Sequence, residues 1–166
     1  MRPAAASGQP DAMKRPPVPP RPTPRLAVRG ILLIEDRLLL VNAYPGQRSD
    51  LLCAPGGGVE PHASLPENLR REFHEETGLE IAVGAPCLVN EFHAPERGFH
   101  QVDIYFRVEL VAGDPFGPWT DPEGVVNRRV LASRADMAGL RYKPDSLPDA
   151  AWGMDVVYDP LEPLVR

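Results

Sequence analysis

Residues 55–79 read PGGGVEPHASLPENLRREFHEETGL and contain the clearest local signals in the chain. Three successive glycines open the stretch, and because glycine reaches backbone conformations that other residues avoid, they predict a tight loop. Ser64 and Glu67 then have the S-x-x-E form of a capping box, with proline tolerated in the first turn. Helix-forming residues continue to Glu76, and Gly78 is a typical helix terminator. The stretch therefore predicts a glycine loop followed by a helix.

The predicted helix carries three acidic side chains on one face. Glu72, Glu75 and Glu76 stand at positions i, i+3 and i+4, which are neighbours on a helix surface. Such close like charges repel, so either water solvates the whole face or a hard cation such as Mg²⁺ or Mn²⁺ neutralises it. Arg71 can pair with Glu75 four residues on. An apolar stripe should fix the helix to a sheet and leave the acidic face toward the glycine loop; it consists of Leu65, Leu69 and Phe73.

The glycine, arginine and glutamate positions also match a longer pattern, G-x5-E-x7-R-E-U-x-E-E-x-G-U, in which U is apolar. The matching residues are Gly57, Arg71, Glu72, Phe73, Glu75, Glu76, Gly78 and Leu79. In this stretch the chain resembles the Nudix hydrolases. One position departs from the pattern, because Ala63 stands where its first glutamate is expected and His62 where glycine is common. Glu60, three residues upstream, is a candidate to compensate.

The resemblance implies a fold of the α+β class, an α/β/α sandwich. We expect a mixed β-sheet, the loop and helix of the Nudix box, and a short C-terminal helix. The order of the predicted elements agrees, since it departs from regular βαβ winding. Strand-like segments cover about 26–34, 38–43, 79–94, 100–112 and 125–131, and a second capping box at Ser133 predicts a short helix toward Leu140.

The resemblance also implies a reaction, the metal-dependent hydrolysis of a diphosphate linkage by attack of water at phosphorus. The substrate would be a nucleotide or nucleotide sugar, either ADP-ribose-like or a nucleoside triphosphate. The implied cofactor is Mg²⁺ or Mn²⁺, held by Glu72, Glu75, Glu76 and a backbone carbonyl of Gly57 or Gly56. Arg71 would orient the glutamates. The general base is left open among Glu76, Glu123 and Asp121.

Ala63 leaves a second hypothesis open. The chain could be a Nudix-fold module that binds or regulates through a nucleotide-like ligand, with weak or no catalysis. The intact Glu72, Glu75 and Glu76 argue against this, because a binding module has no need to keep three carboxylates together. Turnover by the wild-type protein distinguishes the two hypotheses.

Residues outside the box should select the substrate. Pro95 lies sixteen residues beyond Leu79, a placement that resembles the ADP-ribose and nucleotide-sugar members of the family. Candidate substrate-binding residues are Pro95, Phe99 and Arg29. Aromatic side chains that could stack on a base, unless they fill the core, also include Phe92, Tyr105 and Trp119.

The chain divides into three predicted regions. Eight of its 21 prolines precede Arg25, so we expect residues 1–25 to be a disordered proline-rich tail. Met13 is an alternative start to Met1. Residues 26–145 are expected to form the Nudix domain and residues 146–166 a C-terminal extension, in which further prolines argue against regular structure.

The net charge and the lengths of the apolar runs indicate which kinds of partner the chain binds. The 166 residues have a formal net charge of −5, which argues against a surface that binds nucleic acid, whereas the family resemblance implies a small nucleotide-type substrate. No apolar run approaches the roughly 18 residues that span a bilayer, and no signal peptide is evident, so we expect no membrane partner and a cytoplasmic location. Cys53 and Cys87 are expected to be buried, reduced thiols. The strand edges of a small sandwich also allow a homodimer.

Overall fold

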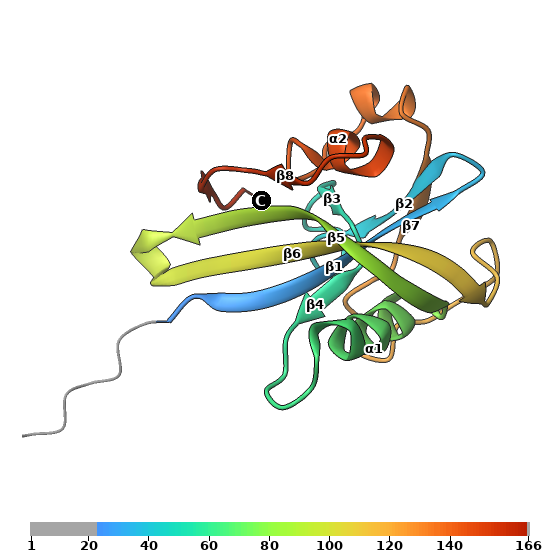
Figure 1. The fold of residues 1–166 in the computed structure, drawn as a ribbon, viewed down its shortest axis with the longest axis horizontal. Helices are drawn as coiled ribbons and strands as arrows, with labels where there is room; N and C mark the ends of the chain where they lie inside the picture. Colours follow the sequence, from blue (N-terminus) through green and yellow to red (C-terminus); the bar gives the residue numbers. More distant parts are fainter. Residues whose placement is uncertain (1–22, 166) are drawn as a thin grey trace, which may run out of the picture.

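The computed structural model describes residues 23–165, so the predicted tail lies outside it except for its last residues (Figure 1). The strands are β1 (Arg25–Ile34), β2 (Arg37–Asn42), β3 (Leu52–Cys53), β4 (Gly56–Gly58), β5 (Glu80–Ala94), β6 (Phe99–Ala112), β7 (Arg129–Ala132), β8 (Val157–Tyr158) and β9 (Glu162–Pro163). The helices are α1 (Leu65–Thr77) and α2 (Leu147–Trp152), with short 3-10 helices η1 (Pro95–Arg97) and η2 (Asp136–Gly139).

The strands form a mixed sheet in the order β3-β2-β1-β6-β5-β8. The central pair, β1 and β6, is parallel, whereas β1–β2 and β5–β6 are antiparallel hairpins. Glu35 and Asp36 connect β1 to β2 with positive φ angles of 48° and 60°, as a tight hairpin turn requires. β4 pairs with β1, β7 with β2 and β9 with β5. The prediction of a mixed sheet is confirmed.

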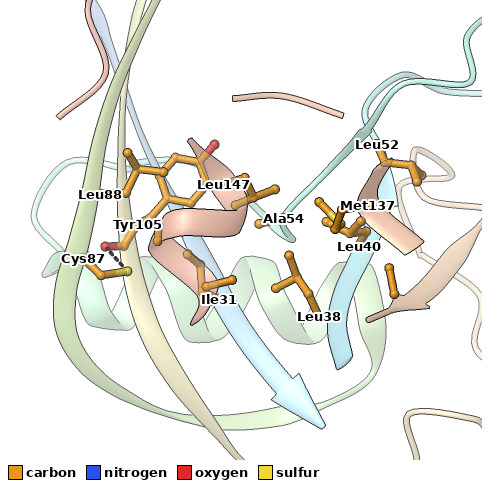
Figure 2. Packing of buried hydrophobic residues seen from close by; sticks show 13 residues of the cluster. Ile31, Leu38, Leu40, Leu52, Ala54, Cys87, Leu88, Tyr105, Met137 and Leu147 are labelled. Carbon is orange, nitrogen blue, oxygen red and sulfur yellow. Dashed lines mark hydrogen bonds between the residues drawn. The ribbon is translucent and has the colours of Figure 1, made fainter. Parts of the chain in front are cut away.

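The two helices cover opposite faces of the sheet (Figure 1). On one face, Leu69 and Phe73 of α1 are fully buried against apolar residues of the central strands. On the other, Leu147 of α2 packs among side chains that include Tyr105 and Leu88, as Figure 2 shows. Burying one apolar face of each helix on the sheet produces the three-layer α/β/α sandwich that the sequence predicts.

Four local predictions differ from the structure. The predicted strand at 125–131 begins only at Arg129, and the predicted helix after Ser133 is the short 3-10 helix η2. The predicted glycine loop is partly the short strand β4. Residues 146–165 contain α2, β8 and β9 in spite of their prolines, because Pro148 lies in the first turn of α2 and the two strands are only two residues long.

Candidate functional site

Helix α1 forms as its sequence predicts. The Ser64 hydroxyl accepts a 3.3 Å hydrogen bond from the Glu67 N–H, and the Glu67 carboxylate accepts one of 2.8 Å from the Ser64 N–H. Gly78 ends the helix in the left-handed conformation, at φ 71°. Leu69 and Phe73 are fully buried against the sheet, and Glu72, Glu75 and Glu76, on a different face of the helix, are half-buried.

The three glycines of β4 bring the backbone against this helix. Gly56 has φ 141°, and a Cβ atom there would overlap the carbonyl oxygen of Val28 on β1. A Cβ atom at Gly57 would overlap the carboxylate of Glu72. At both positions, therefore, only glycine fits without displacing a neighbour.

Glu76 is the most perturbed acid of the site. Its Oε2 accepts a 2.8 Å hydrogen bond from the N–H of Gly56. Burial raises its pKa to about 7, although the nearby Arg29 guanidinium and the Gly56 N–H act in the opposite direction. A carboxyl group whose pKa is raised this far, next to two further carboxylates, is a candidate for a functional site.

Arg71 holds the other two glutamates. Its guanidinium lies 2.9 Å from Glu72 Oε1 and 3.2 Å from Glu75 Oε2, and more distantly, 3.8 Å, from the exposed Glu60. Burial raises the pKa of Glu72, with further contributions from Glu75 and Glu123. Arg71 thus contacts both carboxylates, which is compatible with a role in orienting them.

The carboxylate and backbone oxygens at this site are the kind of ligand that a hard divalent cation binds. As the side chains stand, no three His, Cys, Asp or Glu residues between positions 23 and 165 share one cation-sized centre. Arg71 and the Gly56 N–H each contact one oxygen of the carboxylates that they bind. However, three half-buried carboxylates on one helix face, with the bare backbone of Gly57 against Glu72, are the oxygen donors that such cations bind.

The β6–β7 loop (residues 113–128) carries the other candidate bases. Asp121 is only 4% exposed, and its carboxylate accepts the N–H groups of Glu123, Val125 and Val126 at 2.7–2.9 Å. Its oxygens therefore fasten the loop. Glu123 is exposed, and its charge is the last of the contributions to the raised pKa of Glu72. Of the two loop acids, Glu123 is the one free to accept a proton.

A pocket of about 440 Å³ opens beside β4, on the face of the sheet opposite α1. Its lining includes two of the predicted substrate-binding residues, Arg29 and Phe99, together with Phe92 and Tyr105. Pro95 lies instead in the exposed turn η1 at the tip of the β5–β6 hairpin. The lining is cationic, with Arg25, Arg29, Arg97 and Lys143, and includes no acidic residue.

Arg29 also has a structural partner that the sequence did not indicate. Its guanidinium donates to Asp103 Oδ1 at 3.1 Å and to the carbonyl oxygens of Ala54 and Gly56 at 3.1 and 3.0 Å. Gln101 donates to both oxygens of the fully buried Asp103. The available signal was the alternation of Gln101, Asp103 and Tyr105 on one face of a strand, which puts a charge on a buried face.

A second hollow, of about 480 Å³, lies on the α1 side. Its lining includes Glu76, Phe116, Trp119 and Arg129. Trp119, a predicted base-stacking candidate, therefore lies apart from the pocket that contains Phe92 and Phe99.

Comparison with known proteins gives consistent matches. A family model described as NUDIX domain matches residues 23–148. An ADP-ribose pyrophosphatase of Methanocaldococcus jannaschii is 30% identical over 93 residues, which are 55% of this chain and 54% of that protein. The chain spans about half the length of the curated relatives it matches.

Solved structures share the fold. A NUDIX hydrolase from Nitrosomonas europaea superposes with a TM-score of 0.61 at 22% identity, covering 77% of this chain and 86% of that one. A UDP-X diphosphatase superposes with a TM-score of 0.64 at 20% identity, covering 82% and 68%. At these identities the likeness concerns the fold. The helices between Thr23 and Val165 are too short or too polar to cross a bilayer.

Proposed function

Because the chain belongs to the Nudix family, we propose that it hydrolyses a diphosphate linkage in a nucleotide or nucleotide sugar of the ADP-ribose class. One observation supports this most directly. Glu72 and Glu76 lie against the glycine backbone of β4, and Glu75 lies beside them on α1, where Arg71 pairs with both Glu72 and Glu75. Arg71 offsets only part of the charge of this cluster, so the cluster is costly to maintain without a metal cation, which favours a diphosphate-cleaving site over a solvated helix face.

The carboxylates and the Gly57 carbonyl are the proposed ligands of Mg²⁺ or Mn²⁺. When bound, the cation supplies neutralisation of charge at the diphosphate and a more acidic water. Arg71 keeps Glu72 and Glu75 oriented through its two ion pairs. The Gly56 N–H orients Glu76 through a hydrogen bond.

Glu123 is the proposed general base. It takes a proton from the attacking water while the water oxygen forms a bond to phosphorus and the bond from phosphorus to the bridging oxygen breaks. The electron pair of that bond stays on the bridging oxygen, which leaves as part of the departing phosphate. The exposed position of Glu123, in a loop that contacts α1 through Trp119, is compatible with access to such a water.

The pocket of about 440 Å³ is the proposed site for the part of the substrate beyond the glycine strand. Phe92 and Phe99 offer apolar walls for a planar base. Arg25, whose guanidinium lies against Gly58, would meet a phosphate at the junction of pocket and β4. The volume lies within the range of small-molecule sites, about 300–1,000 Å³.

The experiment measures turnover and binding on the same sample. Purified protein is incubated with Mg²⁺, Mn²⁺ or a chelator and with ADP-ribose, other nucleotide sugars, dinucleoside polyphosphates and nucleoside triphosphates, and released phosphate is read after phosphatase coupling. We expect metal-dependent turnover of a nucleotide sugar that Glu76→Gln reduces by at least about 100-fold. Glu109→Gln, at an exposed position of β6, is the matched control and should keep full activity.

The alternative, a binding module, is favoured only by Ala63. It makes a distinct prediction, because ADP-ribose would then bind in calorimetry while no metal supports turnover. In that case Ala63→Glu tests the cause, since recovered turnover would assign the loss to this position. Turnover by the wild-type protein rules the binding module out.

A further inference from the structure

The β6–β7 loop crosses the C-terminal end of α1, and Trp119 makes the closest contact. The indole ring lies over Gly78, where a Cβ atom would come within 2.5 Å of it. The His74 ring, one turn earlier in the helix, is tilted against the same indole at a centroid distance of 5.4 Å. Trp119 nevertheless remains 41% exposed, so burial of apolar surface alone does not account for its position.

Polar contacts explain the position of the indole. The last carbonyl groups of a helix have no donor within the helix and need other partners. In α1, Trp119 Nε1 donates a 2.9 Å hydrogen bond to the carbonyl oxygen of Glu75. Arg129, at the start of β7, donates to the carbonyl of Thr77 at 2.9 Å and also to the carbonyl of Gly117 in the loop. One side chain from within the loop and one from the first residue of the strand that follows it thus bind carbonyl groups of the helix terminus.

The segment that follows Trp119 is internally rigid. Asp121 accepts three backbone N–H groups within residues 123–126, and it is buried. Glu123 belongs to this turn, and its N–H is one of the three donors.

Two contacts attach this turn to the rest of the fold. Two residues before Asp121, Trp119 donates to the carbonyl oxygen of Glu75 on α1, and Asn42 Nδ2 on β2 donates a 2.8 Å hydrogen bond to the carbonyl oxygen of Val125. Of these two contacts, the one made by Trp119 joins the turn to α1.

We propose that Trp119 is a positioning residue, which fastens the β6–β7 loop, and with it the turn that carries Glu123, to the end of α1. This inference rests on the proposed function, because Glu123 matters for catalysis only if the protein is a hydrolase. It also assigns Trp119 a role other than stacking on a base, since the indole N–H and one side of the ring are already occupied by α1.

The first test removes one hydrogen bond and keeps the ring. Trp119→Phe eliminates the indole N–H, and Trp152→Phe is a matched control, because Trp152 Nε1 donates its own 2.9 Å bond to Asp36 at the β1–β2 turn. Amide hydrogen exchange of residues 121–126 should rise by about three- to tenfold in Trp119→Phe, the factor expected for one hydrogen bond. Trp152→Phe should leave that segment unchanged. Equal exchange in Trp119→Phe and wild type would overturn the fastening.

The second test asks whether Trp119 acts through Glu123. Trp119→Phe should lower kcat for ADP-ribose by about three- to tenfold with KM within about twofold of wild type. In a Glu123→Gln background the same substitution should change kcat by less than about twofold, because its target is already absent. Independent multiplication of the two losses, or a raised KM with unchanged kcat, would contradict the proposal, and the latter result would indicate contact with substrate.

Failure of the proposed function is recognisable separately. If the wild-type protein turns over no substrate of the panel with any metal, the proposed hydrolase is wrong. The exchange comparison between Trp119→Phe and Trp152→Phe still decides whether the indole fastens the loop, since it needs neither metal nor substrate.

Discussion

The backbone N–H of Gly56 donates a 2.8 Å hydrogen bond to the Oε2 atom of Glu76, which connects β4 to the acidic face of α1. The bond is possible because Gly56 has φ 141°, a conformation that other residues rarely adopt. It partly offsets the burial of Glu76, whose pKa nevertheless rises to about 7. The same contact therefore links the geometry of the site to its response to pH.

We expect the metal-free protein to lose stability as pH rises from about 4.5 to about 7. The pKa of Glu76 is raised from 4.5 in the folded state, so the folded protein binds this proton more tightly than the unfolded chain. The stabilisation is complete below pH 4.5 and is lost as pH passes the folded pKa, by on the order of 3 kcal/mol. Urea unfolding in chelator at several pH values measures it. Glu76→Gln should flatten this dependence, and an identical slope in both proteins would refute the assignment.

Gly57→Ala should impair the site more than the fold. The added Cβ atom would overlap the Glu72 carboxylate, which must then leave its position against β4. We expect at least about a tenfold loss of kcat, with unfolding free energy changed by about 1–3 kcal/mol. Gly139→Ala is the matched control, because a Cβ atom there meets nothing within 4 Å. Equal activity of the two variants would show that Glu72 is not placed by Gly57.

Arg29→Met should destabilise the protein strongly. It leaves the fully buried Asp103 without its ionic partner, a change that costs about 3–5 kcal/mol. Arg134→Met removes an exposed pair with Asp149 and should cost less than about 1 kcal/mol. Urea unfolding compares the two. A similar small cost in both variants would mean that Arg29 serves the substrate pocket alone.

Cys53 should react slowly with thiol reagents in the native protein. Burial raises the pKa of its thiol from 9.0 to about 11, so the thiolate fraction at pH 8 falls by about 100-fold. Burial also raises the pKa of the Cys87 thiol. A chromogenic disulfide at pH 8 should therefore modify both residues only after unfolding in urea. Rapid native modification of Cys53 would show that reagents reach its half-buried thiol through the pocket that it lines.

The sequence was most informative where local signals agree. Helix α1 could be predicted because capping box, apolar stripe and terminal glycine all lie within one short stretch. The strand expected at 125–131 failed for a reason that is not local. Asp121 accepts the N–H groups of Val125 and Val126, and Asn42 accepts those of Asn127 and Arg128, so these donors are unavailable to the sheet.

The site shows the same division. The spacing of the glutamates placed Glu72, Glu75 and Glu76 on one helix face correctly, because helix geometry fixes it. Arg29 was expected to bind substrate and does line the pocket, yet its pairing with Asp103 spans 74 residues and depends on the parallel register of β1 and β6. No pattern within either strand specifies that register.

The parallel pairing of β1 with β6 also has a consequence for how the chain acquires its structure. Arg25 pairs with Gln101, 76 residues further on, so during synthesis β1 emerges long before its neighbour exists. Until then β1 can pair only with β2 and β4, and its other edge stays open to other chains. Sheet closure must therefore be a late step across a large loop, which favours folding in milliseconds to seconds and exposes early intermediates to aggregation.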